Sequence, residues 1–417
     1  EARDVGYPAL PMDVSLAQAF IGSVSWVQTD FIGGFTNWET KLYANSITHV
    51  MDDSKRPDVP IRMDMPGWSD TYGYFSQTKL KRDKHLFLAK LDGFYNRSLA
   101  EMTMYPNDPN EREMFMLTWP DVRTLNVGFY GEDMITLKES SLKISTRLAL
   151  QGFNVANELG LGSLRIFYPE MNQQQTRFLK SVSTLYRKKF KEIDFNAGLS
   201  YGDRAPSVSE GFGFYLFNSF DNHDYIGNPD LKNEKAVEAN MKISFPLKKI
   251  SLSLEGNYFH TTDFIIGAVH PDLSVMTIGA EGVKMYKNLE YANLYNLALD
   301  ANYQIMKELS WTGVVSYHRG NDQDSLQYKR GEFSGNLTMR GAAAQVNFNP
   351  DYGEDKTDAY TVFSLSLGNS FSISTDEVYV KAGVENVFDA NYSTYSDWKN
   401  IPRMGRNVYL SLTYAIN

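Results

Sequence analysis

The chain has 417 residues, a net charge of −9 and no cysteine. The missing cysteines exclude disulfides, thiolate metal sites and cysteine nucleophiles within these residues, and the acidic balance excludes the basic footprint that a nucleic-acid partner requires. No apolar run approaches the ~20 residues of a membrane-spanning helix. Aromatic residues make up 14% of the chain, led by 26 Tyr and 25 Phe. This composition fits both a soluble β protein and a membrane barrel whose strands are each half polar.

The N-terminal stretch, EARDVGYPALPMDV (1–14), lacks a basic segment that leads into an apolar one. A secretory signal peptide has that order of segments. We therefore expect a processed chain or a fragment.

The first long alternating segment is NWETKLYANSITHVM (37–51). Its even positions, such as Leu42 and Val50, are apolar or small, and most of its odd positions are polar. Successive strand side chains point to opposite faces, so the even face suits lipid and the odd face suits a polar lumen. His49 and Met51 are therefore predicted to point inward together, about 7 Å apart.

Three methionine pairs follow this strand. They are Met63 and Met65 in IRMDMP, Met102 and Met104 in EMTMYP, and Met114 and Met116 in REMFML. When strand directions are counted from the long loops, all of these pairs and the His49–Met51 pair fall on one rim. Met102 and Met104 also share a face with Lys90 and Asp92, which predicts that they point into the lumen.

Thioethers are soft, neutral ligands that select Cu(I), and imidazole also suits copper, whereas hard cations prefer oxygen. The sequence therefore predicts a copper-collecting surface at the outer mouth. Methionine also fills irregular apolar cores, so both metal binding and packing stay open for the Met63/Met65 and Met102/Met104 pairs, and packing is favoured for Met114/Met116. The predicted metal ligands are His49, Met51, Met63, Met65, Met102 and Met104.

The rest of the chain keeps the period of two that indicates strands, as in 238–245 and 251–258. About fifteen such segments, each ~10 residues or longer, are joined alternately by short and long connections. The short links include 81–84, 246–249 and 306–308, and the long stretches are 52–69, 203–235, 262–290, 319–357 and 389–404.

Short turns on one rim and long loops on the other are typical of a transmembrane β-barrel. A soluble sandwich would have shorter strands, and no fixed-period repeat supports a solenoid or propeller. We predict an all-β, antiparallel transmembrane barrel of the outer-membrane receptor type that occupies 1–417 as a single domain. A sheet in lipid must close, and the pattern leaves open whether this chain closes alone or lacks strands upstream.

Several other polar residues have simpler interpretations. His260 and His270 look like ordinary polar residues, and the acidic loop stretches DNHDY (221–225) and GNDQDS (320–325) predict a solvated outer face. The sequence contains no nucleophile elbow, no phosphate-binding loop and no His-Glu-x-x-His motif. We therefore expect a protein that is not an enzyme and has no catalytic cofactor.

Three motifs resemble the TonB-dependent outer-membrane receptors. RAPSVSE (204–210) and NPDLKNEKA (228–236) resemble mid-barrel loop motifs of that family, in the same order. The closing motif is carried by Gly383, Asn386, Phe388, Asp389, Tyr392, Pro402, Gly405 and Arg406. Members have a plug inside a barrel of 22 strands, so the resemblance implies that this chain is the C-terminal portion of a receptor barrel without its plug.

HVMDD (49–53) and the methionine-rich stretch after it resemble the copper-receptor branch of the family. In that branch a barrel His-x-Met joins a plug Cys-x-x-x-Met, and His49 and Met51 match the barrel half. The resemblance implies copper or a copper complex as the transported ligand, outer-membrane lipid as surroundings, and the TonB system of a Gram-negative bacterium as energy source through a plug. The alternatives are a haem or siderophore receptor, in which His223 would bind haem, and a passive porin or structural barrel.

Overall fold

The structure is a computed structural model that describes residues 1–6, 12–29, 35–57, 59, 61–106, 110–218, 221–277, 279–304, 309–317, 321–330, 333–342, 344, 356–373, 376–394 and 401–415. The chain forms two compact units. The first comprises Glu1–Leu185, Leu199–Val237 and His260–Ala292, and the second Tyr186–Gly198, Glu238–Phe259 and Asn293–Asn417. Each unit is described by itself.

Strands dominate the described residues. In the first part of the chain they are β1 (Ala2–Val5), β2 (Asp13–Thr29), β3 (Phe35–Asp52), β4 (Arg62–Arg82), β5 (His85–Tyr105), β6 (Met114–Thr136), β7 (Ser140–Val155), β8 (Gln174–Phe190) and β9 (Ile193–Arg204). Short elements follow in a long connection: helix α2 (Val208–Phe212), β10 (Leu216–Asn218) and β11 (His223–Ile226). Helix α1 (Glu158–Phe167) lies between β7 and β8.

The later strands continue the same pattern. They are β12 (Glu234–Pro246), β13 (Ile250–Val269), β14 (Gly282–Gln304), β15 (Leu309–Tyr317), β16 (Asn321–Arg330), β17 (Phe333–Ala342), β18 (Tyr360–Ile373), β19 (Asp376–Glu385) and β20 (Asn407–Ala415). Among the described residues, no helix is both long and apolar enough to span a membrane.

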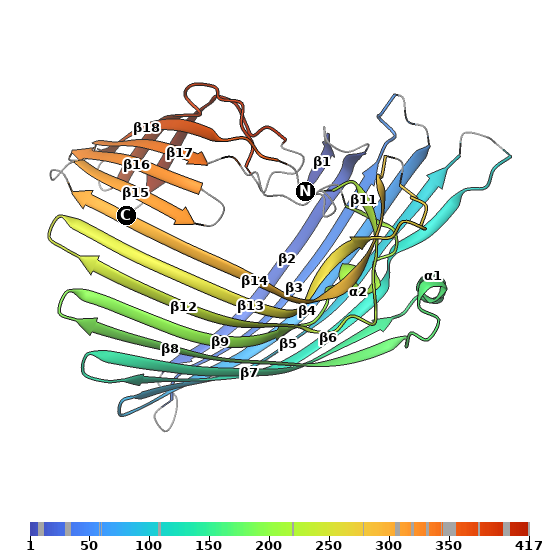
Figure 1. The fold of residues 1–417 in the computed structure, drawn as a ribbon, viewed down its shortest axis with the longest axis horizontal. Coiled ribbons are helices and arrows are strands. Elements are labelled where there is room, and N and C mark those ends of the chain that lie inside the picture. Colours follow the sequence, from blue (N-terminus) through green and yellow to red (C-terminus); the bar gives the residue numbers. More distant parts are fainter. Residues whose placement is uncertain are drawn as a thin grey trace. The chain divides into compact units, whose positions relative to one another are not determined.

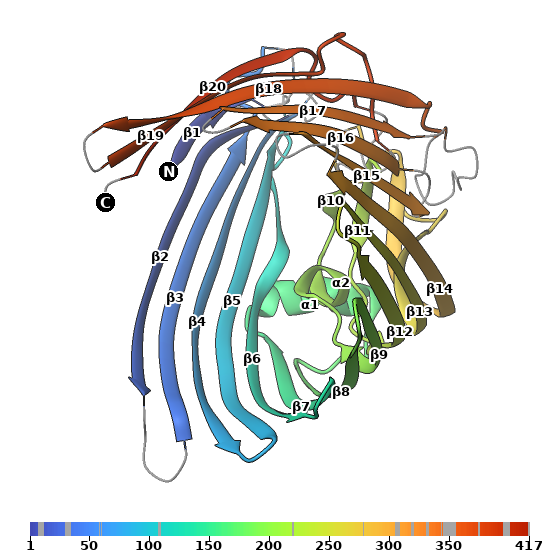
Figure 2. The same cartoon turned by 90° about the vertical axis from the view of Figure 1, so that its left-hand side faces the viewer.

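Long antiparallel pairs build the first unit, in which β2 to β7 run side by side (Figures 1 and 2). The predicted short link at 81–84 is a tight turn between β4 and β5, where Asp83 has a φ of 52°. Asp tolerates this left-handed conformation better than most residues because its short side chain bonds to nearby backbone groups. The link at 306–308 lies outside the described residues.

Some of the predicted long loops contain strands. The stretch 319–357 was expected to be irregular, and this is wrong, because β16 and β17 occupy much of it. Their polar composition hides the alternation that identifies strands elsewhere. β4 likewise begins at Arg62 inside the predicted loop 52–69, which places Met63 and Met65 on a strand.

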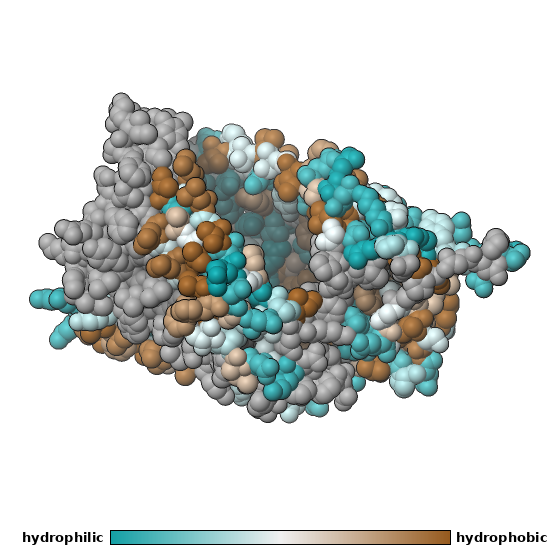
Figure 3. Space-filling view, turned by 90° about the horizontal axis from the view of Figure 1, so that it is seen from above, coloured by the Kyte–Doolittle hydropathy of each residue, from teal (hydrophilic) through white to brown (hydrophobic). Residues whose placement is uncertain are grey.

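The faces of the first-unit strands follow the predicted alternation. One face of β3 to β6 carries exposed apolar side chains, including Leu42 (60% exposed), Tyr72 (56%) and Leu125 (55%). The opposite face carries polar contacts such as the Asn96 amide, which donates to Ser69 and Thr71. Figure 3 shows exposed apolar atoms beside polar ones on the surface seen from above. An apolar outer face with a polar inner one is the arrangement that lipid requires.

Glycine makes room for an ion pair on the polar face. Arg147 forms a two-bond contact with Asp92, at 2.5 and 2.6 Å. The guanidinium crosses Gly128, where an added Cβ would lie 2.3 Å from Arg147 Nη2. The absent side chain therefore lets β7 reach β5 across β6.

Candidate metal-binding site

The strand registers bring the predicted methionines into cross-strand pairs. Met51 lies opposite Met65, and Met63 lies opposite Met104. Met102 in turn lies opposite Met116. Directly opposed residues share a face with Cβ atoms about 4.5–5.5 Å apart. Strands β3 to β6 therefore place the predicted methionine pairs in one continuous ladder. The ladder lies at the strand ends that lead into the long loops.

His49 belongs to the same face as this ladder. It lies two positions before Met51 on β3, and the face opposite carries the exposed side chains of Leu42 and Tyr72. Its cross-strand neighbours are Ala17 and Gly67. Both neighbours are small, and His49 is half-buried.

Most of the methionine ladder is buried. The exposed fractions are 3% for Met63, 0% for Met102, 3% for Met104 and 5% for Met116. Met51 and Met65 are half-buried and pack against this cluster. Met63, Met102 and Met104 thus do not form the exposed collecting surface that the sequence suggested, and their role as metal ligands stays a prediction.

Segments that are distant in sequence complete the cluster, and no spacing pattern in the sequence indicates them. Met12 and Met171 are also buried in it, and Met276 and Met285 pack against it from the β13–β14 connection and β14. Isolated methionines in loops carry no spacing signal, so only the folded chain reveals that they meet.

Substitution of Met102 tests how much of the ladder serves packing. Met102→Ala should lower the free energy of unfolding by about 2–5 kcal/mol, because it leaves a cavity where the side chain is fully buried. Met102→Leu conserves volume and should cost less than about 1.5 kcal/mol. Urea unfolding of the two variants measures the difference. If Met102→Leu destabilised as much as Met102→Ala, a packing role would be contradicted.

Folded loops cap the methionine cluster. Leu161 and Leu164 of α1 and Phe212 of α2 are buried in it. Trp119 Nε1 donates to Ser209 Oγ at 3.1 Å, which ties the start of β6 to α2. Ser207 and Glu210 form a capping box at the N-terminus of α2. Each backbone N–H donates to the side chain of the other residue, which stabilises the start of this short helix.

A buried ion pair lies within the same loops. Lys284 Nζ donates to Asp221 Oδ2 at 2.7 Å, and the two side chains are 1% and 7% exposed. The Tyr225 hydroxyl donates to the same oxygen at 2.6 Å. β11 pairs in parallel with the start of β14. This pairing brings Lys284 and Asp221 together, although they are 63 residues apart in the sequence.

The acidic stretch 221–225 is therefore not a solvated outer face. Asp221 is 8% exposed and Asp224 is fully buried. Asp224 Oδ2 accepts the backbone N–H groups of Met276 and Thr277, at 2.7 and 2.9 Å. In a sequence, a carboxylate that accepts hydrogen bonds from loop backbone looks the same as a solvated one. The prediction of a solvated outer face at 221–225 was wrong for this reason. The side chains of the other acidic stretch, 320–325, lie outside the described residues.

Burial also changes the acid–base behaviour of the tyrosines in the cap. Burial, with a smaller contribution from Asp230, raises the pKa of Tyr168 to about 12. Burial and then the hydrogen bond to Asp221 raise the pKa of Tyr225. Each phenol therefore stays neutral in the fold above its ordinary pKa near 10, and the stability it contributes is lost as the pH rises from about 10 toward its folded value.

Three further histidines, His223, His260 and His270, lie apart from the ladder in sequence. His223 begins β11, and its Nδ1 contacts the Asp221 carbonyl at 2.5 Å. The His260 ring packs near Tyr291, with 5.8 Å between ring centroids. His270 lies at the start of the β13–β14 connection, where its N–H donates to the Val283 carbonyl. Among the residues that the structure describes, no three His, Asp or Glu side chains are placed to hold a metal.

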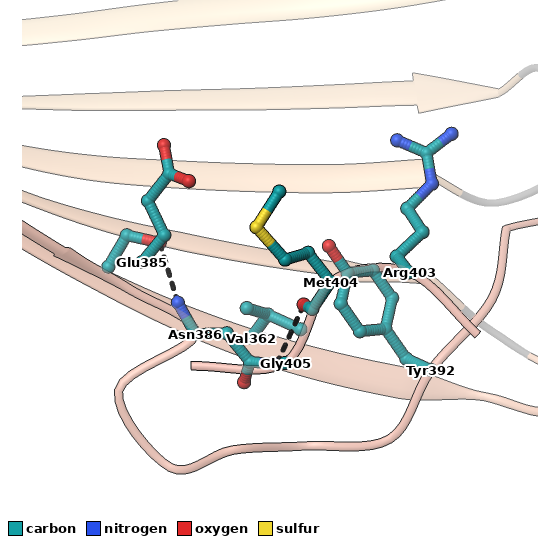
Figure 4. A pocket seen from close by; sticks show the side chains of 8 residues that line it. Val362, Glu385, Asn386, Tyr392, Arg403, Met404 and Gly405 are labelled. Carbon is teal, nitrogen blue, oxygen red and sulfur yellow. Dashed lines mark hydrogen bonds between the residues drawn. The ribbon is translucent and has the colours of Figure 1, made fainter. Parts of the chain in front are cut away.

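A pocket in the second unit is formed by the closing motif (Figure 4). Its volume is about 400 Å³, and Glu385, Tyr392, Arg403 and Met404 line it. Asn386 holds the motif together, since its amide donates to the Ala390 carbonyl at 2.8 Å and to the Met404 carbonyl at 3.4 Å. The motif thus ends β19 and directs the chain back into β20.

These strands, faces and loops define an antiparallel outer-membrane receptor barrel. The family model described as "TonB dependent receptor-like, beta-barrel" matches residues 22–387. The chain therefore belongs to the TonB-dependent receptor family, and the predicted fold class and family are confirmed. No curated protein matches the sequence.

Solved structures show the same fold. The copper transporter OprC is 18% identical, with a TM-score of 0.81 over 97% of this chain and 66% of that one. The FrpB iron transporter from Neisseria meningitidis (F3-3 variant) is 11% identical, with a TM-score of 0.64 over 99% of this chain and 66% of that one. The ferric citrate transporter FecA is 10% identical, with a TM-score of 0.65 over 97% and 62%. This chain therefore spans slightly less than two thirds of these proteins.

Proposed function

We propose that the chain is the barrel portion of an outer-membrane import receptor for copper or a copper complex in a Gram-negative bacterium. In this proposal 1–417 is one barrel domain, and a plug from outside these residues couples it to TonB. The protein is a transport receptor and not an enzyme. The observation that carries the copper assignment is the half-buried set of His49, Met51 and Met65 on the polar face of β3 and β4.

The geometry of this set supports a soft ion. Met51 and Met65 are directly opposed, and the imidazole of His49 lies one side-chain position away on the same face. Two thioethers and one imidazole suit Cu(I) better than a hard cation. In this proposal a further ligand comes from a plug or from the copper complex, next to the small cross-strand neighbours of His49, Ala17 and Gly67.

The buried methionines act differently in this proposal. Met63, Met102 and Met104 continue the ladder beneath the cap, so an ion held by Met51 and Met65 would reach these buried thioethers only if the loops moved. Their first role is to pack the outer end of the barrel. Among solved neighbours, the name of OprC supports copper, while the names of FrpB and FecA keep iron and its chelates as the alternative.

Copper accumulation in cells tests the proposal. Cells that produce the complete receptor should accumulate more copper than cells without it, and the gain should disappear when the inner membrane is de-energised or TonB is deleted. Uptake that persists without energy would identify a passive porin. Purification with a haem absorbance band that His223→Ala abolishes would favour the haem alternative.

A further inference from the structure

An outward-facing row of charged side chains crosses the first unit at one level. Arg97 on β5 lies directly opposite Asp70 on β4 and Arg123 on β6. By alternation, all three share the face of the exposed Tyr72 and Leu125. The row is therefore on the lipid side of the barrel, where an isolated charge is costly.

The height of this row corresponds to a membrane surface. Arg97 lies twelve positions after His85, the first residue of β5. At about 3.3 Å per residue and a tilt of about 45°, this is about 28 Å along the membrane normal, beyond an apolar band of about 25 Å. The apolar side chains of Phe87, Leu91 and Tyr95 occupy the same face below Arg97, so the row begins where the apolar band ends.

A third side chain holds the two arginines in place. Arg97 Nε donates to Asp121 Oδ1 at 2.6 Å, and Arg123 Nη2 donates to Asp121 Oδ2 at 3.4 Å. Asp121 has a φ of 50° and lies next to a register shift between β5 and β6. This irregular backbone brings its carboxylate, which is 11% exposed, between two guanidinium groups that are 40% and 46% exposed.

Each guanidinium keeps unused donors. Both terminal nitrogens of Arg97, and Nε and Nη1 of Arg123, make no hydrogen bond with any described residue. Two like charges directly opposite each other are destabilising without a counter-ion. Asp121 lies between the two arginines, and Asp70 on β4 is a second carboxylate directly opposite Arg97. Asp70 lies on the far side of Arg97, where it accepts a bond from Ser46 at 2.6 Å.

We propose that Arg97 and Arg123 bind the phosphate of a lipid headgroup in the outer leaflet. Guanidinium groups bind phosphate through paired, charge-assisted hydrogen bonds. A phosphorylated lipid presents this anion at the height of the row while its acyl chains cover Leu91 and Leu125 below. The inference depends on the barrel fold alone and stands whether or not the receptor transports copper.

Lipid retention by the complete receptor tests this site. The receptor is placed in phosphatidylcholine nanodiscs containing bis-phosphorylated lipid A, and bound lipid A is counted by native mass spectrometry. Arg97→Gln/Arg123→Gln should reduce retention about tenfold or more, since each lost bond involves a charged group. Arg97→Lys/Arg123→Lys keeps the charge but not the paired geometry, and it should retain an intermediate amount.

The control is Arg187→Gln, which removes one positive charge from an exposed position near the C-terminal end of β8 and should leave retention unchanged. Arg123→Gln alone breaks only the 3.4 Å contact, so it tests the site even if the double variant folds poorly. Equal retention of dephosphorylated lipid A, or equal retention by the double variant, would overturn the proposal. Arginine-dependent binding of inorganic phosphate without preference for the lipid would overturn the lipid as its source.

Discussion

Replacement of His49 and Met51 by alanine should weaken copper binding by the plug-containing receptor at least about 100-fold, since loss of even outer-shell partners of a metal typically costs 10–100-fold. The double variant removes the imidazole and one thioether from the open part of the ladder. Met65→Ala should have a smaller effect, because it removes one thioether and keeps the His-x-Met pair. Copper titration in detergent with a Cu(I) competitor measures each affinity.

Two controls separate this site from general effects. Met404→Ala removes an exposed thioether, 70% accessible, from the pocket of the second unit and should leave copper affinity unchanged. Binding of iron chelates should be the same in all variants. Unchanged copper stoichiometry and affinity in the His49/Met51 double variant would exclude these residues as ligands.

Lys284→Met should open the cap, because it leaves Asp221 buried without its cation. Removal of one partner from a buried ion pair typically costs about 3–5 kcal/mol. The loss should concentrate where the pair joins β11 to β14. Hydrogen exchange of residues 221–226 and 276–285 should accelerate, and peroxide should oxidise Met102 faster, since that side chain is fully buried in the intact cap.

A matched exposed pair provides the control. Lys235 Nζ also lies 2.7 Å from an aspartate, Asp263, but its side chain is 41% exposed. Lys235→Met should therefore cost no more than about 1 kcal/mol. Asp221→Asn combined with Lys284→Met should recover part of the loss, because no buried charge remains. Equal protection of the cap in Lys284→Met and Lys235→Met would show that the buried pair does not hold it.

Much of the strand architecture could be predicted because its physical cause is local. A strand in lipid needs apolar residues on one face, so the alternation in 37–51 predicted both β3 and the shared face of His49 and Met51. The same alternation placed Met102 and Met104 on one face of β5. β16 and β17 were missed because their polar sequences lack that contrast.

By itself, the sequence determined the fold class, the family motifs and the strand faces of His49, Met51, Met102 and Met104, because a period of two depends only on neighbours along one strand. Only the tertiary structure decided the burial of Met63 and Met102, the helices that cap them, and the pairing of Asp221 with Lys284. These depend on loops that meet after long separations in the chain. The sequence pattern of a loop gives the charge of Asp221 but not the partner that neutralises it.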